Sequence, residues 1–293
     1  MKITRAVITA AAPSQRNLPL QTLVDRDGVP KTVLRILVEE ARSAGAEEIC
    51  VVVCAGDEDP YKAAAGDQAS LLRFVEQDQP RGYGHAIYCA RDFVDDAPFL
   101  HMVGDHIYVS AYAADGSDRG TKSPGGCAHQ LVTAAGIHAC SVSAVQSTRE
   151  NLLPLFGAVG GQRVRGAHDL YTIDRVIEKP TPTEAEQSLM VPGLRSGNYL
   201  CFLGAHVLSP VVMDLLGSAL RNTHGHVELS PILNDLAARE RYLALEAKGR
   251  RYPVDVRYGL LTAQIALALS GRDRDEVLTL LCDLLAHRQM DGF

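Results

Sequence analysis

Residues 77–108 read QDQPRGYGHAIYCARDFVDDAPFLHMVGDHIY, and three patterns in this stretch predict the architecture of the chain. A polar, glycine-containing loop at 79–84 has a backbone that can approach a ligand closely. A helical pattern follows at 85–93, and a short apolar strand at 99–103 ends just before Asp105. Open α/β sheets bind ligands at the carboxyl ends of their strands, so Asp105 is expected to lie at a ligand site.

The segments before this stretch repeat the same alternation of strand and helix. A first strand is expected at 3–10, a helix at 31–43, a buried strand at 48–55 and a further strand at 71–75. Strand and helix in alternation are typical of a doubly wound α/β sheet, which is expected to be mixed and mostly parallel.

The second half of the chain continues the pattern after a Gly-, Ser- and Asp-rich stretch at 111–128, which is interpreted as a mobile loop. Ser230 and Pro231 are expected to serve as N-cap and first-turn residue of one helix. Two apolar helices close the chain, and they either pack on the domain or form a subunit contact. The strands are expected at 139–146, 170–179 and 198–203, and the helices at 129–135, 210–220, 228–238, 258–269 and 274–287.

Composition excludes several classes of protein. The 293 residues are 46% hydrophobic and 22% charged, as in an ordinary globular domain, and the net charge of −6 argues against nucleic acid or an anionic membrane as partner. No apolar run reaches the ~18 residues of a membrane span, and the apolar start is too short for a signal peptide. The seven cysteines form no CxxC pair, which favours free thiols in the cytoplasm.

Gln77, Gly82, the Gly84–His85–Ala86 run and the strand that ends before Asp105 resemble a known family. They are similar to the nucleotide-binding half of bacterial sugar-1-phosphate nucleotidyltransferases, nearest to the glucose-1-phosphate uridylyltransferases. The resemblance extends over about residues 4–271. It implies a single Rossmann-like nucleotidyltransferase domain over 1–293, with a nucleotide-binding half (1–135), an inserted sugar-phosphate-binding β region (136–257) and C-terminal helices (258–293).

The resemblance also implies roles for residues on the nucleotide side. Gln77 and Gly82 would read the base, and Gly84 and His85 would contact the nucleotide at the start of a helix. The alternative for His85 is a cap or core histidine. Asp105 would hold Mg²⁺, which takes one or two protein carboxylates and completes its shell with phosphate and water. The family's second metal carboxylate falls on Pro253 in this sequence, so Asp255, two residues along, is the expected substitute.

On the sugar side, Glu178-Lys179-Pro180 matches the EKP of the family. Glu178 would accept hydrogen bonds from sugar hydroxyls and Lys179 would meet the sugar phosphate, with Gly157 and Asn198 in the same pocket. The alternative for this pair is an exposed ion pair at a strand end, which contributes at most ~1 kcal/mol.

The N-terminal loop departs from the family. The family reads Gly-x-Gly-Thr-Arg, whose backbone N–H groups cradle a triphosphate, whereas this chain reads Ala12-Pro13-Ser14-Gln15-Arg16 there. Ala11 and Ala12 are still expected to contact the nucleotide. Arg16 remains as a phosphate ligand, and Lys31 is a displaced candidate for the family's phosphate-binding lysine. Arg16, Lys31, Asp105 and Lys179 are therefore the expected catalytic residues.

These features predict an enzyme that condenses a nucleoside triphosphate, expected to be UTP, with glucose 1-phosphate or another hexose 1-phosphate. The expected partners are these small molecules, with a homo-oligomer left open. One alternative is a catalytically weak nucleotide-sugar-binding or regulatory homologue, which the altered loop favours. Another is a related glycosyltransferase. A dehydrogenase is set aside because no GxGxxG follows the first strand.

Overall fold

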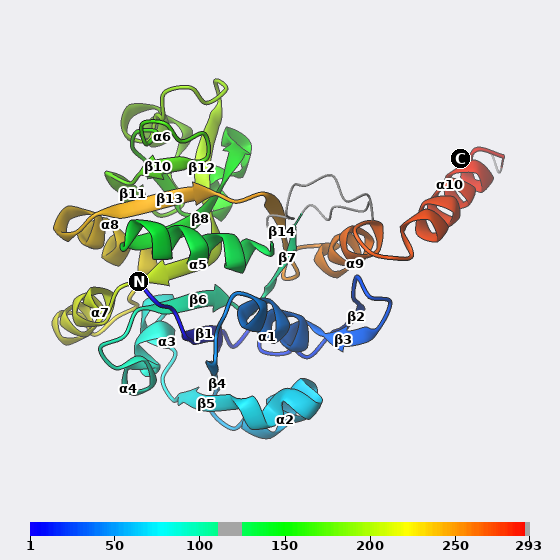
Figure 1. The fold of residues 1–293 in the computed structure, drawn as a ribbon, viewed down its shortest axis with the longest axis horizontal. Coiled ribbons are helices and arrows are strands. Elements are labelled where there is room, and N and C mark those ends of the chain that lie inside the picture. The colour runs from blue at the N-terminus through cyan, green and yellow to red at the C-terminus, as the bar shows by residue number, and fades with distance from the viewer. Residues whose placement is uncertain (111–124, 291–293) are drawn as a thin grey trace.

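The computed structural model describes residues 1–110 and 125–290 and has a layered α/β architecture (Figure 1). The central sheet runs in the order β10-β13-β8-β12-β6-β1-β4-β5, and β9 and β11 extend it beside β12. The strands are β1 (Arg5–Ala10), β4 (Glu48–Cys54), β5 (Leu72–Gln77), β6 (Phe99–Val103), β8 (Ser141–Arg149), β9 (Ala158–Gly160), β10 (Leu170–Thr172), β11 (Arg175–Ile177), β12 (Asn198–Leu208) and β13 (Tyr242–Glu246).

The sheet is mixed, as expected, and β12 is the point at which its direction changes. β5, β4, β1 and β6 are parallel to one another, and β13 is parallel to β8. β12 lies between β6 and β8 and is antiparallel to both. Two small ladders lie outside this sheet: β2 (Thr22–Val24) with β3 (Pro30–Thr32), and β7 (His106–Ser110) with β14 (Gly249–Pro253).

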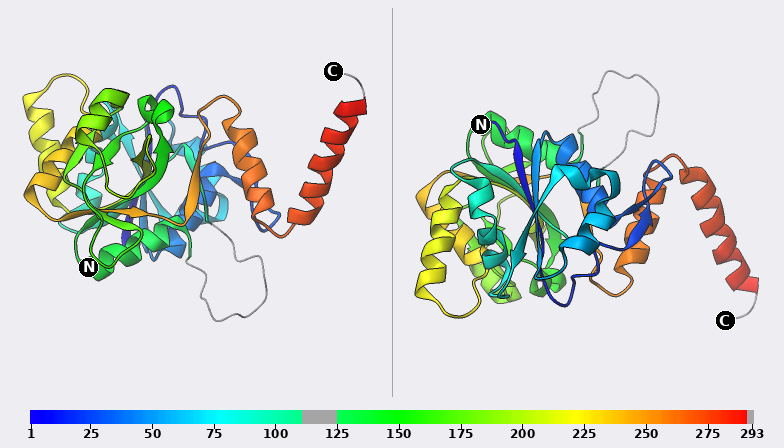
Figure 2. Two further views of the ribbon diagram at one scale, coloured as in Figure 1. Left: turned by 90° about the horizontal axis from the view of Figure 1, so that it is seen from above. Right: turned by 90° about the horizontal axis from the view of Figure 1, so that it is seen from below.

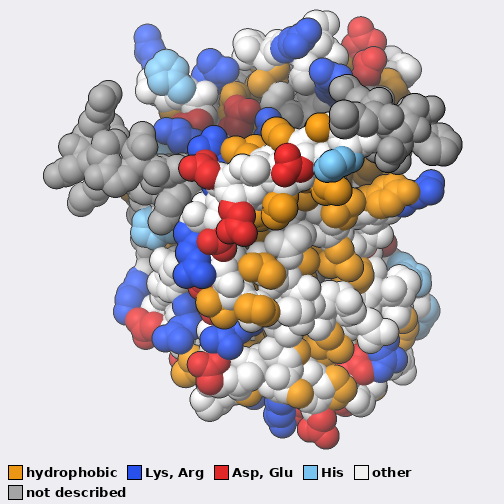
Figure 3. All heavy atoms as spheres, turned by 90° about the vertical axis from the view of Figure 1, so that its right-hand side faces the viewer, with side chains coloured by type: hydrophobic (Ala, Val, Ile, Leu, Met, Phe, Trp, Pro, Cys, Tyr) orange, Lys and Arg blue, Asp and Glu red, His pale blue; other side chains and the backbone are white. Residues whose placement is uncertain are grey.

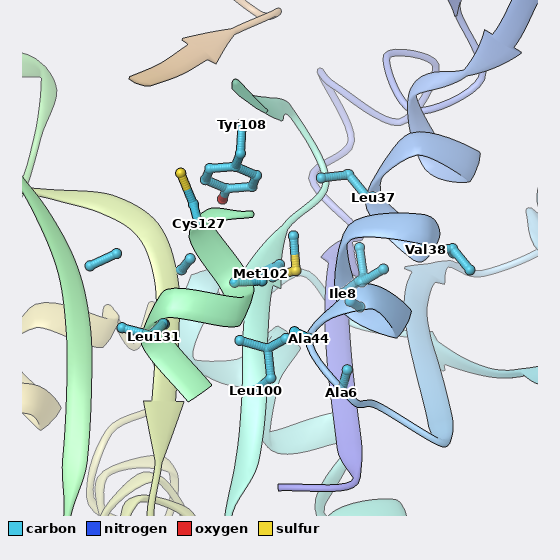
Figure 4. Packing of buried hydrophobic residues seen from close by; sticks show 14 of the residues in the cluster. Ala6, Ile8, Leu37, Val38, Ala44, Leu100, Met102, Tyr108, Cys127 and Leu131 are labelled. Carbon is cyan, nitrogen blue, oxygen red and sulfur yellow. The ribbon is translucent and has the colours of Figure 1, made fainter. Parts of the chain in front are cut away.

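Helices cover both faces of the sheet because successive side chains of each strand point to opposite faces. Ala6 and Ile8 of β1 pack with α1, α2 and α5, whereas Val7 packs with α3, α4, α7 and α8. Figure 4 shows the first of these cores between β1, β6, α1 and α5. The helices are α1 (Val33–Ser43), α2 (Glu58–Ala65), α3 (Tyr83–Cys89), α4 (Arg91–Val94), α5 (Cys127–His138), α6 (Pro182–Ser188), α7 (Val211–Asn222), α8 (Leu229–Arg239), α9 (Gly259–Leu269) and α10 (Arg274–Met290), with 3₁₀ turns η1 (Gly66–Leu71) and η2 (Glu150–Leu155).

Several local expectations need correction. The helix expected at 85–93 is divided at Ala90 into α3 and α4, and the strand expected at 170–179 is divided into β10 and β11. Ser230 is not an N-cap: Glu228 is, so Ser230 lies in the first turn of α8 with its hydroxyl free for another partner. Of the loop expected at 111–128, residues 111–124 lie outside the described part of the chain, and α5 begins at Cys127.

The two C-terminal helices differ in how they pack. α9 contacts β2 and β14, whereas α10 extends away from the body and contacts mainly α9 (Figures 1 and 2). Viewed from the side of α10, hydrophobic side chains are spread over the surface (Figure 3). The exposed leucines of α10 are Leu278, Leu280, Leu284 and Leu285. None of the described helices is long and apolar enough to cross a membrane.

Candidate nucleotide and sugar-phosphate site

A cavity of about 470 Å³ opens at the carboxyl ends of β1, β5 and β6. Segments that are far apart in the sequence meet there, as expected for the ligand site of an open α/β sheet. Among its lining residues are Ala11, Ala12, Pro13, Gln15, Gln77, Gly82, Tyr83, Asp105, Phe156, Glu178, Lys179, His226, Glu228 and Asp255.

Of the carboxylates that line this cavity, Asp105 follows β6 and Asp255 follows β14. Asp105 Oδ1 lies 2.6 Å from His106 Nδ1, and Asp255 Oδ2 accepts a hydrogen bond of 2.9 Å from Gln15. Burial raises the pKa of Asp105, but the hydrogen bond and charge of His106 outweigh burial and leave that pKa below its usual value. Carboxylate oxygens are the hard donors that Mg²⁺ prefers, so the residues present fit that ion.

The loop between β5 and α3 is clamped to the segment that precedes α8. Val227 N donates to Arg81 O, and Gly84 N donates to Val227 O, both at 2.8 Å. Gly82 has a φ of +94°, and a Cβ on Gly82 or Gly84 would lie within 3.0 Å of Val227 O. Both glycines are therefore needed for this close approach, whether or not a ligand is bound.

Gly84→Ala is expected to destabilise the protein by about 1–3 kcal/mol, because the added methyl group overpacks against Val227 and Leu216. Urea unfolding at pH 7.5 measures the loss. Gly136→Ala in α5 is the matched control, because its Cβ would meet nothing closer than 3.5 Å. Equal stability of the Gly84 and Gly136 variants would contradict the clamp.

Glu178, which the resemblance predicts to bind sugar hydroxyls, is held by a residue that the sequence did not suggest. Ser230 Oγ, buried in the first turn of α8, donates to Glu178 Oε2 at 2.5 Å. Gly157 makes room for this contact, because a Cβ there would lie 2.7 Å from Ser230 Oγ and 2.9 Å from Glu178 Oε2. Ser230 thus fixes one oxygen of Glu178 at the cavity wall.

Ser230→Ala is expected to raise the KM for the sugar 1-phosphate about 10-fold and to leave kcat nearly unchanged, since a hydrogen bond to a charged group contributes ~1.5–3 kcal/mol. Steady-state kinetics with the sugar phosphate varied at saturating nucleotide measures this. Ser218→Ala, in α7, serves as control. An unchanged KM in Ser230→Ala would show that Glu178 does not need this contact.

Lys179 adopts a backbone conformation that is uncommon for lysine. Its φ is +46°, its N–H donates to Phe156 O at 3.2 Å, and its Nζ lies 3.9 Å from Glu178 Oε1. A left-handed residue other than glycine is strained, and such strain is concentrated at functional sites. The side chain is 59% exposed at the cavity wall and its ammonium has a long ion pair with Glu178, so it can also meet an anion from the cavity.

The two cations expected to bind the triphosphate do not line the cavity. Arg16 forms an ion pair with Asp57, and Tyr61 donates to its carbonyl. Lys31 is buried, with Nζ 2.8 Å from Asp25 and 2.7 Å from both Asp27 and Glu39. Burial lowers the pKa of Lys31, but the hydrogen bonds to these carboxylates outweigh burial and raise it above its usual value.

Other expected residues are placed as follows. Ala11 and Ala12 line the cavity, whereas Gly84, His85, Gly157 and Asn198 do not. His85 Nδ1 lies 2.9 Å from Gln77 Nε2, and the side chain of Asn198 donates to the carbonyls of its own turn.

Arg251, on β14, was also missed by sequence analysis. Its guanidinium lies 3.3 Å from the centre of the Phe156 ring and donates to the Phe202 carbonyl. Burial lowers the pKa of Arg251 to about 10. The contact braces Phe156, which lines the cavity beside Lys179.

The chain has the α/β fold of the sugar-1-phosphate nucleotidyltransferases. A UDP-glucose pyrophosphorylase complexed with UDP-glucose superimposes with a TM-score of 0.69 at 21% identity, covering 90% of this chain and 98% of that one. A UDP-glucose pyrophosphorylase from Acinetobacter baumannii gives 0.71 at 19% identity, covering 96% and 99%.

The sequence comparison confirms the resemblance to the UTP–glucose-1-phosphate uridylyltransferases. One such protein, from Streptococcus pyogenes, is 27% identical over 92% of this chain and 90% of its own length. Another, YngB from Bacillus subtilis, is 24% identical over 97% of this chain and 96% of its own. No protein-family model matches the sequence.

Proposed function

We propose that this chain is a UTP–glucose-1-phosphate uridylyltransferase. A phosphate oxygen of glucose 1-phosphate attacks the α-phosphorus of UTP, and a P–O bond forms there. The bond between the α-phosphorus and the bridging oxygen breaks, and pyrophosphate leaves with that oxygen, giving UDP-glucose. Relatives that span almost the whole chain carry this activity in their names, which supports the proposal.

The observation that carries the proposal is the convergence of separate segments on one cavity. The segments that line it carry Gln77, Asp105, Asp255, Glu178 and Lys179. A nucleotidyl transfer needs little covalent chemistry from the protein, so holding two substrates in line is the main task.

Each group has a defined part in that task. Asp105 and Asp255 would hold Mg²⁺. The bound ion would neutralise the negative charge that develops on the phosphates. Lys179 would hold the phosphate of the sugar, and Glu178 would accept hydrogen bonds from sugar hydroxyls. The segment 11–15 lines the cavity where the triphosphate would lie, and Arg16, at its end, would reach that triphosphate on leaving Asp57.

The proposal is tested by pyrophosphate release from the purified protein with Mg²⁺, glucose 1-phosphate and each of UTP, dTTP, CTP, GTP and ATP. Release with UTP above the other nucleotides is expected. Release with another nucleotide would correct the base. Binding of UTP without release, for glucose 1-phosphate and other hexose 1-phosphates alike, would replace the enzyme with a nucleotide-binding homologue.

A further inference from the structure

The amide of Gln77 lies at the end of β5 on the cavity wall, and its nitrogen has two neighbours. Nε2 is 3.3 Å from the Gly82 carbonyl oxygen and 2.9 Å from His85 Nδ1. Gln77 itself is only 5% exposed. The amide is therefore held between its own loop and the first turn of α3, with little freedom to rotate.

The orientation of this amide follows from hydrogen-bonding chemistry. A carbonyl oxygen has lone pairs only, so the end of the amide that meets Gly82 must be the NH₂ group. The second hydrogen then points to His85 Nδ1, which accepts it when the ring carries its proton on Nε2. That Nε2 lies 3.9 Å from Cys89 Sγ, a weak acceptor, so the tautomer is consistent on both sides.

His85 remains neutral at pH 7, as an acceptor must. Burial is the largest cause that lowers the pKa of His85, and the positive charge of Arg81 lowers it further. A hydrogen bond with the backbone of Gln79 raises this pKa by a smaller amount. Both hydrogens of the Gln77 amide are then used inside the protein. Its Oε1 has no donor among the described residues, and it is the group that Gln77 can offer to a ligand.

We propose that His85 is a positioning residue for base selection: it locks the Gln77 amide so that only an acceptor, Oε1, faces the nucleobase. An acceptor at that point pairs with the imide N–H of uracil or thymine. Cytosine presents a lone pair at the same ring nitrogen, and two acceptors facing each other repel. This inference rests on the proposed function in one respect, that the base lies against Gln77.

The test measures binding rather than turnover, so that it does not depend on catalysis. Isothermal titration gives the Kd of UTP and of CTP for the wild type and for His85→Phe, which keeps a ring but offers no acceptor. The wild type is expected to bind UTP more tightly than CTP. The ratio of the Kd for CTP to the Kd for UTP is expected to fall roughly 10-fold in His85→Phe, because the amide loses its partner and can turn its NH₂ group toward the base.

Three further variants make the result specific. His85→Asn places an oxygen where Nδ1 stood and is expected to restore the preference. Cys89→Ala changes the other side of the same ring and is expected to leave the ratio unchanged. His85→Ala removes the acceptor with a small side chain, and it replaces His85→Phe if circular dichroism shows that the latter is not folded.

The outcomes of this test distinguish a failure of the inference from a failure of the proposed function. A folded His85→Phe or His85→Ala that keeps the wild-type ratio overturns the inference, as does a wild type that binds UTP and CTP equally or binds neither. A wild type that prefers UTP, with the ratio lost in His85→Phe, supports the inference even if no pyrophosphate is released. In that case only the proposed function fails.

Discussion

Asp105→Asn is expected to lower the rate of pyrophosphate release by about 10³-fold at saturating substrates. The substitution keeps the shape of the side chain and removes its charge, so the protein loses the carboxylate at the end of β6 that fits Mg²⁺. Loss of one well-placed electrostatic group costs ~10²–10³ in rate, and loss of a metal ligand is at the upper end. A water molecule cannot easily take the place of the lost carboxylate, because the Asp105 side chain is only 20% exposed.

The measurement is kcat with Mg²⁺ titrated to saturation, so that weaker metal binding and slower chemistry are separated. Asp214→Asn is the control, because Asp214 is 73% exposed and pairs with Arg91 on the surface. His106→Gln removes the partner of Asp105 without removing its charge, and a much smaller loss is expected. If Asp105→Asn retained turnover within a few-fold, the metal assignment would be wrong.

Acid is expected to destabilise this protein through two buried histidines. Tyr83 Oη meets His101 Nε2 at 2.6 Å, His101 Nδ1 donates to Val7 O, and the His101 ring stacks on His206 with centroids 5.9 Å apart. Burial lowers the pKa of His101 to about 4, and burial and the His101 charge lower that of His206. Between pH 6.5 and 4 the unfolded chain therefore binds protons that the native protein does not.

The direction in which stability changes with pH follows from this difference in bound protons. Stability is fully present above pH 6.5, the usual value for histidine, and is lost as the pH falls toward the native pKa. The shift of His101 alone corresponds to about 3 kcal/mol in the free energy of unfolding between pH 7 and pH 4. Urea unfolding at half-unit pH steps measures the loss.

His101→Gln is expected to be less stable at pH 7 but to show a flatter dependence on pH. His224→Gln, at an exposed position before α8, is the control and should keep the wild-type slope. An equally steep profile in His101→Gln would assign the acid effect to other groups.

The sequence predicts an element such as β6 well because its side chains are mostly apolar and buried. β6 was expected at 99–103 and lies there, because four of its five residues are buried and the run is apolar. β7 and β14 were missed because they pair with each other across more than 130 residues, and β14 is in addition only partly buried. The residue pattern of one strand does not indicate which distant segment will pair with it.

The same limit applies to the site. The residues that line the cavity at the ends of strands, such as Asp105 and Gln77, could be proposed from the sequence because strand ends and ligand sites coincide in open sheets. Ser230 could not, because its role depends on contact with Glu178, 52 residues away, and its position near a helix start suggested a cap instead. The ion pair that holds Arg16 depends on Asp57 in the same way.

β12 is bonded on one side to β6, which leads to Asp105, and on the other to β8 and β9. β9 in turn pairs with β11, which leads to Glu178 and Lys179. Among the described strands, the segment that carries the candidate metal ligand and the segment expected to bind the sugar phosphate are therefore joined by one continuous ladder. We expect the sheet to set the distance between these two groups, and the turns that rim the cavity to set the width of its mouth.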